Sequence, residues 1–196
     1  MSQPKPWINP VHPLRFPVEL PDGSRLERVE VFPFTVGEHR AALAKAGKDE
    51  DARYEALAVL ATGLDVAALE VLKRTDYISL QILLQEYISL PATYYQELDR
   101  EAADFDPDDV PLMIPIKGIG KVIERVAIEP PSVKVTKGMA KLKTADEKAD
   151  FCTSACTGIP VEVLNRMSIP DWTQLQGRLD DFLNKPASYF QPTTSK

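Results

Sequence analysis

Two stretches of the sequence repeat one another, and this duplication constrains the fold more than any other feature. Residues 51–96 align with residues 146–191 at a constant shift of 95 and without a gap, and 13 of these 46 positions are identical. Ordinary residue frequencies would give about three identities by chance. Further upstream the match continues at a shift of 97, where Gly23 pairs with Gly120 and Val29 with Val126. The chain is therefore predicted to contain two copies of one unit.

The repeats also set the predicted domain boundaries. The first repeat is placed at residues 13–96 and the second at residues 110–191. Residues 97–109 lie between them and are dense in Asp and Glu, which is typical of a solvated linker. The Pro-rich residues 1–12 and the last residues, 192–196, are predicted to be flexible tails.

Each repeat is predicted to begin with a β-hairpin. In the first repeat, Arg15–Leu20 and Arg25–Phe32 are rich in β-branched or aromatic residues, and a Pro-Asp-Gly-Ser turn separates them. The corresponding strands of the second repeat are residues 112–116 and 122–128. Gly118-Ile119-Gly120-Lys121 between them superficially resembles a phosphate-binding loop. Because the spacing GxxxxGK[ST] is absent and the repeat places these residues opposite a hairpin turn, we interpret them as a turn.

Helices are predicted to follow each hairpin. In the first repeat they cover residues 35–46, 51–62, 65–72 and 75–90, and the second repeat has counterparts of each. The counterpart of the first helix, residues 132–143, is a weaker prediction because it contains β-branched residues and a glycine. The predicted fold class is α+β, with two tandem repeats that each consist of a β-hairpin followed by three or four short helices.

The composition argues against several classes of function. The net charge of -6 does not suit a nucleic-acid surface, which needs clustered Lys and Arg. No apolar run approaches the length of a membrane span, and the N-terminus lacks the apolar centre of a signal peptide. With only two cysteines, the sequence predicts a protein of a reducing, cytoplasmic compartment without a disulfide framework.

No residues predict an active site, a metal site or a cofactor site. His12 and His39 are the only histidines, and neither belongs to a recognisable catalytic arrangement. Cys152 and Cys156 replace Leu57 and Ala61 of the first repeat, so they are interpreted as buried core thiols and not as zinc ligands. The recurrent acidic residues Asp76 and Asp171 lie at helix starts, where capping is a sufficient explanation. The chain is therefore predicted not to be an enzyme.

Comparing the two copies separates the predicted core from the surface. Five residues on one face of the last helix recur as apolar residues and are predicted to be core: Tyr77, Leu80, Leu84, Tyr87 and Ile88, with Trp172, Leu175, Leu179, Phe182 and Leu183 as their counterparts. Ile78, Ile82 and Leu83 become Thr173, Gly177 and Arg178, so the unit does not need them to fold. We interpret Ile78, Ile82 and Leu83 as a surface for partner binding or self-association. The alternative is that they pack against the other repeat or the linker.

One stretch of the first repeat carries a family resemblance. It comprises Leu57-Ala58-Val59-Leu60-Ala61-Thr62-Gly63-Leu64, Leu69 to Leu72, and Thr75-Asp76-Tyr77-Ile78-Ser79-Leu80-Gln81. It resembles the small tail assembly chaperones of contractile-tailed bacteriophages, in which a helix ends in a Thr-Gly-Leu step and a Leu-rich helix with Asp-Tyr follows. The resemblance reaches the second repeat only through the duplication, at Thr157-Gly158-Ile159 and Asp171-Trp172.

The resemblance implies a role in the cytoplasm of the infected host cell. The expected partner is the tape-measure protein, whose apolar helical segments such a chaperone would screen while the tail tube assembles. Two alternatives remain open at this point: a structural tail or baseplate adaptor of the virion, and a small hydrolase with a site assembled from both repeats.

Overall fold

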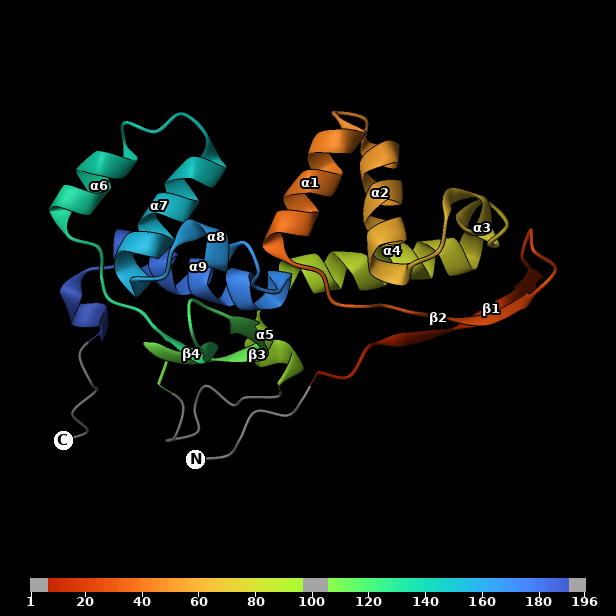
Figure 1. Ribbon diagram of the computed structural model, residues 1–196, viewed down its shortest axis with the longest axis horizontal. Helices are drawn as coiled ribbons and strands as arrows, with labels where there is room; N and C mark the ends of the chain where they lie inside the picture. Colours follow the sequence, from red (N-terminus) through yellow and green to blue (C-terminus); the bar gives the residue numbers. More distant parts are fainter. Residues whose placement is uncertain (1–6, 97–105, 191–196) are drawn as a thin grey trace.

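The computed structural model describes residues 7–96 and 106–190, and it shows two consecutive units of the same build (Figure 1). The first unit consists of β1 (Val11–Glu19), β2 (Arg25–Glu30), α1 (Val36–Ala46), α2 (Glu50–Thr62), α3 (Val66–Glu70), α4 (Arg74–Ser89) and α5 (Ala92–Tyr95). The second unit consists of β3 (Asp109–Lys117), β4 (Val122–Ala127), α6 (Val133–Met139), α7 (Ala145–Thr157), α8 (Val161–Leu164), α9 (Ile169–Asn184) and the 3-10 turn η1 (Ala187–Phe190). The predicted α+β class is confirmed, with two antiparallel hairpins that are each followed by helices.

The observed elements differ from the prediction mainly at their ends. β1 begins at Val11, ahead of the predicted Arg15, because the strand continues beyond an irregularity in the pairing between Pro13 and Val18. α6 ends at Met139 and is shorter than predicted, as its β-branched residues and Gly138 are weak helix formers. The closing turns α5 and η1 were not predicted.

The two units repeat each other in their hydrogen bonds as well as in their sequence. The amide of Phe32 donates to the carbonyl of Ala61 at 2.6 Å, and at the equivalent positions Glu129 donates to Cys156 at 2.9 Å. α2 and α7 both end at a left-handed glycine with φ of +70°. A residue with a Cβ is strained in this conformation, which explains why glycine recurs there.

The recurrent carboxylates of Asp76 and Asp171 tie each hairpin to the long helix behind it. Asp76 accepts from the amides of Arg15 and Phe16 at 2.8 and 3.0 Å, within the irregular stretch of β1. In the second unit Asp171 accepts from the amides of Met113 and Ile114 at 2.6 and 3.3 Å. Helix capping is therefore not the full reason for these residues: they satisfy strand amides that lie in the irregular stretch of the pairing.

Most of the predicted core is buried. Leu80, Leu84 and Tyr87 of α4 and their counterparts Leu175 and Leu179 of α9 are buried, in a core shared by both units. Leu183 is an exception, because 37% of it is exposed although its counterpart Ile88 packs against the core.

Two further interpretations from the sequence hold. Cys152 and Cys156 are buried, as expected for core thiols. The residues that resemble a phosphate loop form the β3–β4 turn, in which the amide of Gly118 donates to the carbonyl of Lys121 at 2.9 Å.

The predicted tails and linker fall partly outside the described residues, which exclude 1–6, 97–105 and 191–196. In the described part of the predicted N-terminal tail, the ring of Trp7 packs edge-on against Tyr87 and Tyr95, with centroids 5.7 and 5.2 Å apart. Within the described ranges, no helix combines the length and the apolar character that crossing a membrane requires.

Candidate functional site

The two units dock through the start of α1, which lies against the loop between α8 and α9. The amides of Val36 and Gly37 donate to the carbonyls of Met167 and Asn165, both at 2.9 Å. Thr35 and Ser168 form an isolated antiparallel bridge beside these bonds. The side chain of Val36 is only 2% exposed, so this contact is part of the interior of the protein.

Arg40 supplies the polar part of the same contact. Its guanidinium donates to both carboxylate oxygens of Asp150, at 2.9 and 3.0 Å, and to Oδ1 of Asn165 at 3.1 Å. It also lies over the ring of Trp172, 5.5 Å from the ring centroid. A fork-like pairing of this kind fixes the angle between the partners as well as their distance. Arg40 therefore sets the orientation of α1 on the second unit.

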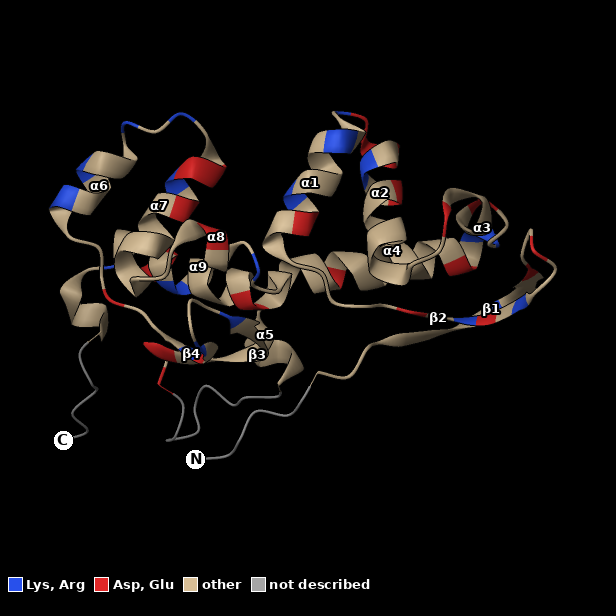
Figure 2. Cartoon of the chain, in the orientation of Figure 1, with Lys and Arg blue, Asp and Glu red and all other residues tan. Residues whose placement is uncertain are grey.

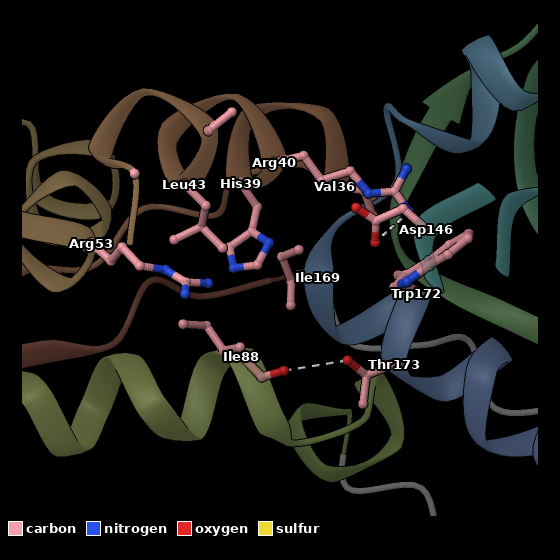
Figure 3. A pocket seen from close by; sticks show the side chains of 12 residues that line it. Val36, His39, Arg40, Leu43, Arg53, Ile88, Asp146, Ile169, Trp172 and Thr173 are labelled. Carbon is pink, nitrogen blue, oxygen red and sulfur yellow. Dashed lines mark hydrogen bonds and ion pairs between the residues drawn. The ribbon is translucent and has the colours of Figure 1, made fainter. Parts of the chain in front are cut away.

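A cavity of about 530 Å³ lies beside this contact and is lined by both units. Figure 3 shows side chains of α1, α2, α4 and α9 around it. Its apolar lining comes from Val36, Leu43, Ala44, Ile88, Ile169 and Trp172, and its basic and imidazole groups from His39, Arg40 and Arg53. We call this cavity the inter-unit cleft. Its size is that of a pocket for a few apolar side chains.

The electrostatics of the inter-unit cleft favour an acidic, apolar ligand. Burial lowers the pKa of His39, and the charge of the adjacent Arg40 lowers it further, so the imidazole stays neutral near neutral pH. Arg40 and Arg53 are two cationic side chains of the lining. Arg40 is already paired with Asp150 and lies 3.7 Å from Asp146, so Arg53 is the lining cation that a ligand carboxylate would meet. An incoming carboxylate beside apolar side chains would find complementary groups there.

The residues that the sequence singled out for partner binding lie on α4, away from the inter-unit cleft lining. Ile78 and Ile82 are 41% and 57% exposed and lie one helical turn apart, so the structure brings them together on one face. Leu83 is only partly exposed and packs against the core. We call Ile78, Ile82 and Leu83 the α4 stripe.

The residues of the inter-unit cleft escaped sequence reasoning, because the cleft exists only when the two units dock. Trp172 was assigned to the core as a counterpart of Tyr77, and it is in fact half-buried beside the cavity. No spacing in the sequence relates Arg40 to Asp150, which lies 110 positions later.

The described residues offer little for nucleophilic or metal chemistry. Burial raises the pKa of Cys156 to about 12 and also raises that of Cys152, so both thiols stay protonated and unreactive at neutral pH. Among residues 7–96 and 106–190, no three His, Cys, Asp or Glu side chains are grouped as a metal site requires.

Comparison with known proteins links the second unit to a family. Residues 109–184 match the family described as phage tail assembly chaperone proteins, E, or 41 or 14. The predicted resemblance is thereby confirmed, over the repeat that it had reached only through the duplication. The match covers one unit of the chain. No curated protein and no solved structure matches the chain in the same comparisons.

Proposed function

We propose that this chain is a bacteriophage tail assembly chaperone that binds the tape-measure protein and assists assembly of the tail tube. The observation that carries the proposal is the match of residues 109–184 to the phage tail assembly chaperones. The chain would act by binding and not by catalysis, in the cytoplasm of the infected host.

The inter-unit cleft is the proposed place for a segment of this client. A long helical client presents apolar side chains at intervals of three and four residues, flanked by charged ones. Leu43, Ile88 and Ile169 would cover the apolar side chains, while Arg53 at the rim would attract flanking carboxylates. Since both units line the cavity, this mode of binding would require the tandem arrangement.

Co-expression with the tape-measure protein of the same phage tests the proposal. The wild-type chain is expected to keep this client soluble and to co-purify with it. Arg53→Glu reverses a charge at the rim of the inter-unit cleft and is expected to weaken co-purification at least about tenfold. Arg28→Glu, at an exposed position of β2, makes the same change of charge outside the cleft and should have no effect. A client that stays insoluble with the wild-type chain would refute the proposal.

The structural adaptor is a second candidate, and analysis of purified virions distinguishes it. An assembly chaperone leaves before the particle is complete, whereas an adaptor remains in stoichiometric amounts. Mass spectrometry of purified particles should therefore find no stoichiometric amount of this chain. Its stoichiometric presence would favour the adaptor.

A further inference from the structure

The contact between the two units joins two different faces. The inserting face of the first unit consists of Val36, Arg40, Ile88, Ala92 and Thr93. The receiving face of the second unit consists of Asp150, Met167, Trp172, Thr173 and Gln174. Besides the bonds of Val36 and Arg40, Thr93 donates to Oε1 of Gln174 at 2.7 Å and Thr173 donates to the carbonyl of Ile88 at 3.4 Å. Since the units are copies, each should also carry the face that the other one uses.

The second unit carries its own inserting face, and that face is uncovered. Val133 is the counterpart of Val36 and is 70% exposed, against 2% for Val36. Leu183, Ala187 and Ser188 are the exposed counterparts of Ile88, Ala92 and Thr93. Lys137 takes the place of Arg40 and keeps the positive charge. The unexpected exposure of Leu183 thus belongs to a whole face that lacks a partner within the described chain.

The first unit carries the matching receiving face. Glu55 takes the place of Asp150. Asp51 takes the place of Asp146, whose carboxylate lies 3.7 Å from the guanidinium of Arg40. Tyr77 replaces Trp172, and the exposed Ile78 of the α4 stripe replaces Thr173. The acidic pair, the aromatic ring and an apolar neighbour are therefore all present. The carboxylates are complementary in charge to Lys137.

These two faces lie on opposite sides of the molecule. Figure 1 shows α6 near one end of the longest axis, whereas α2 and the start of α4 lie on the far side of α1 from it. Figure 2 shows Lys on α6 without any acidic residue, and acidic residues on α2. The two faces of one chain are thus too far apart to meet, whereas the faces of two chains can.

We infer that a second copy of this chain docks head to tail, with the inserting face of its second unit on the receiving face of the first unit. The contact repeats the one between the two units within the chain. Because it joins two different faces, it does not stop at a dimer but propagates into a ring or a helical filament. Ile78 and Ile82 of the α4 stripe would thereby serve self-association, which is separate from client binding in the inter-unit cleft.

Differences between the copies make this contact weaker than the one inside the chain. A Cβ at Gly37 would lie 3.1 Å from the carbonyl oxygen of Asn165. The counterpart of Gly37 in the second unit is Lys134, whose Cβ would require the facing backbone to shift by a few tenths of an ångström. Lys73 and Arg74 replace Ser168 and Ile169, and Arg74 already lies over the Tyr77 ring, 5.7 Å from its centroid.

One difference near the receiving face introduces no clash. The counterpart of Ile82 is Gly177, where an added Cβ would find no atom within 4 Å. If the contact between two chains repeats the one within the chain, the larger Ile82 side chain therefore has open space there.

Sedimentation velocity of the full chain at low salt tests the inference by a charge exchange. The wild type should form species larger than a dimer as its concentration rises. Lys137→Glu places like charges opposite Asp51 and Glu55 and should weaken association at least about tenfold, as should Glu55→Lys. The double variant restores the opposite charges, in reversed order, and should recover most of the association.

The control is Lys121→Glu, which changes an exposed residue of the β3–β4 turn and should associate like the wild type. Circular dichroism of each variant confirms that the fold is retained. A wild type that stays monomeric over the whole concentration range would overturn the inference, and so would a double variant no better than the single ones. Neither position lines the inter-unit cleft, so co-purification of the client should be unchanged, and the two proposals can fail separately.

Discussion

Asparagine in place of Asp171 should change stability in a way that depends on pH. Burial raises the pKa of this carboxyl group to about 6, against the opposing hydrogen bonds from Ser168, Met113 and Ile114. In the unfolded chain an Asp titrates near pH 3.9, so the folded state binds the proton more tightly. The wild type is therefore expected to lose stability as the pH rises from about 4 through 6.

The size of this effect follows from the difference between the two pKa values. Two pK units correspond to about 3 kcal/mol of unfolding free energy between about pH 4 and pH 7.5. Asp171→Asn removes the titrating group and also one hydrogen-bond acceptor. The lost acceptor lowers the free energy of unfolding by about 1–2 kcal/mol at all pH values. The variant should be less stable than the wild type near pH 4 and close to it, or more stable, near pH 7.5.

Asp76→Asn is the matched control, since the equivalent residue of the first unit should not show this rise. The pKa of Asp76 is lowered: burial opposes this, but the amides of Arg15 and Phe16 and the nearby His12, whose Nε2 lies 3.4 Å away, outweigh it. Its carboxylate contributes stability above the unfolded pKa, and this contribution is lost as the pH falls through the folded pKa. Because this loss begins only below the unfolded pKa of about 3.9, Asp76→Asn should cost nearly the same stability at about pH 4 and at pH 7.5.

Urea unfolding of the three proteins at both pH values measures these differences. The free energy of unfolding of Asp171→Asn relative to the wild type should rise by about 3 kcal/mol from about pH 4 to pH 7.5, while that of Asp76→Asn should change by well under about 1 kcal/mol. The reasoning is refuted if Asp76→Asn shows the same rise as Asp171→Asn, or if Asp171→Asn keeps a constant difference from the wild type.

Three further predictions concern stability and association. Arg40→Ala and Asp150→Ala should each lower the free energy of unfolding in urea by about 2 kcal/mol. The double variant should lose little more than one single variant, because both remove one shared set of charge-assisted bonds. Additive losses would contradict this pairing. Gly158→Ala should cost about 1 kcal/mol because its φ is +70°, and an unchanged midpoint would argue against the left-handed helix end. Ile82→Glu should keep thermal stability within about 0.5 kcal/mol of the wild type while weakening self-association; loss of the fold would make Ile82 a core residue.

The architecture of each unit could be predicted because its signals are local. The helix ends at Gly63 and Gly158, the turn at Gly118, and the apolar face that includes Leu80 and Leu175 are all readable from spacing. The extension of β1 to Val11 was not readable in this way. It depends on the long-range bonds of Asp76 to Arg15 and Phe16, which span about 60 positions of sequence.

The inter-unit cleft could not be predicted, because no local signal encodes how two folded units dock. The relevant pairs, Arg40 with Asp150 and Val36 with Met167, lie more than 100 positions apart. Their residue types are also ordinary for exposed helix and loop positions. In the docked structure Val36 and Met167 are buried and Arg40 and Asp150 are half-buried, and these pairings become known only when both units are placed together.

The differences between the copies nevertheless contain part of this information. The residues inside each unit keep their type, as Leu80 and Leu175 do, whereas several of the unmatched pairs lie on the docking faces. Ile169 is buried in the contact between the units, and its counterpart Arg74 is exposed. One chain with two units buries one inserting and one receiving face and leaves one of each uncovered. The unmatched, exposed Ile78 then belongs to the uncovered receiving face, where a second copy, and not the unit itself, would cover it.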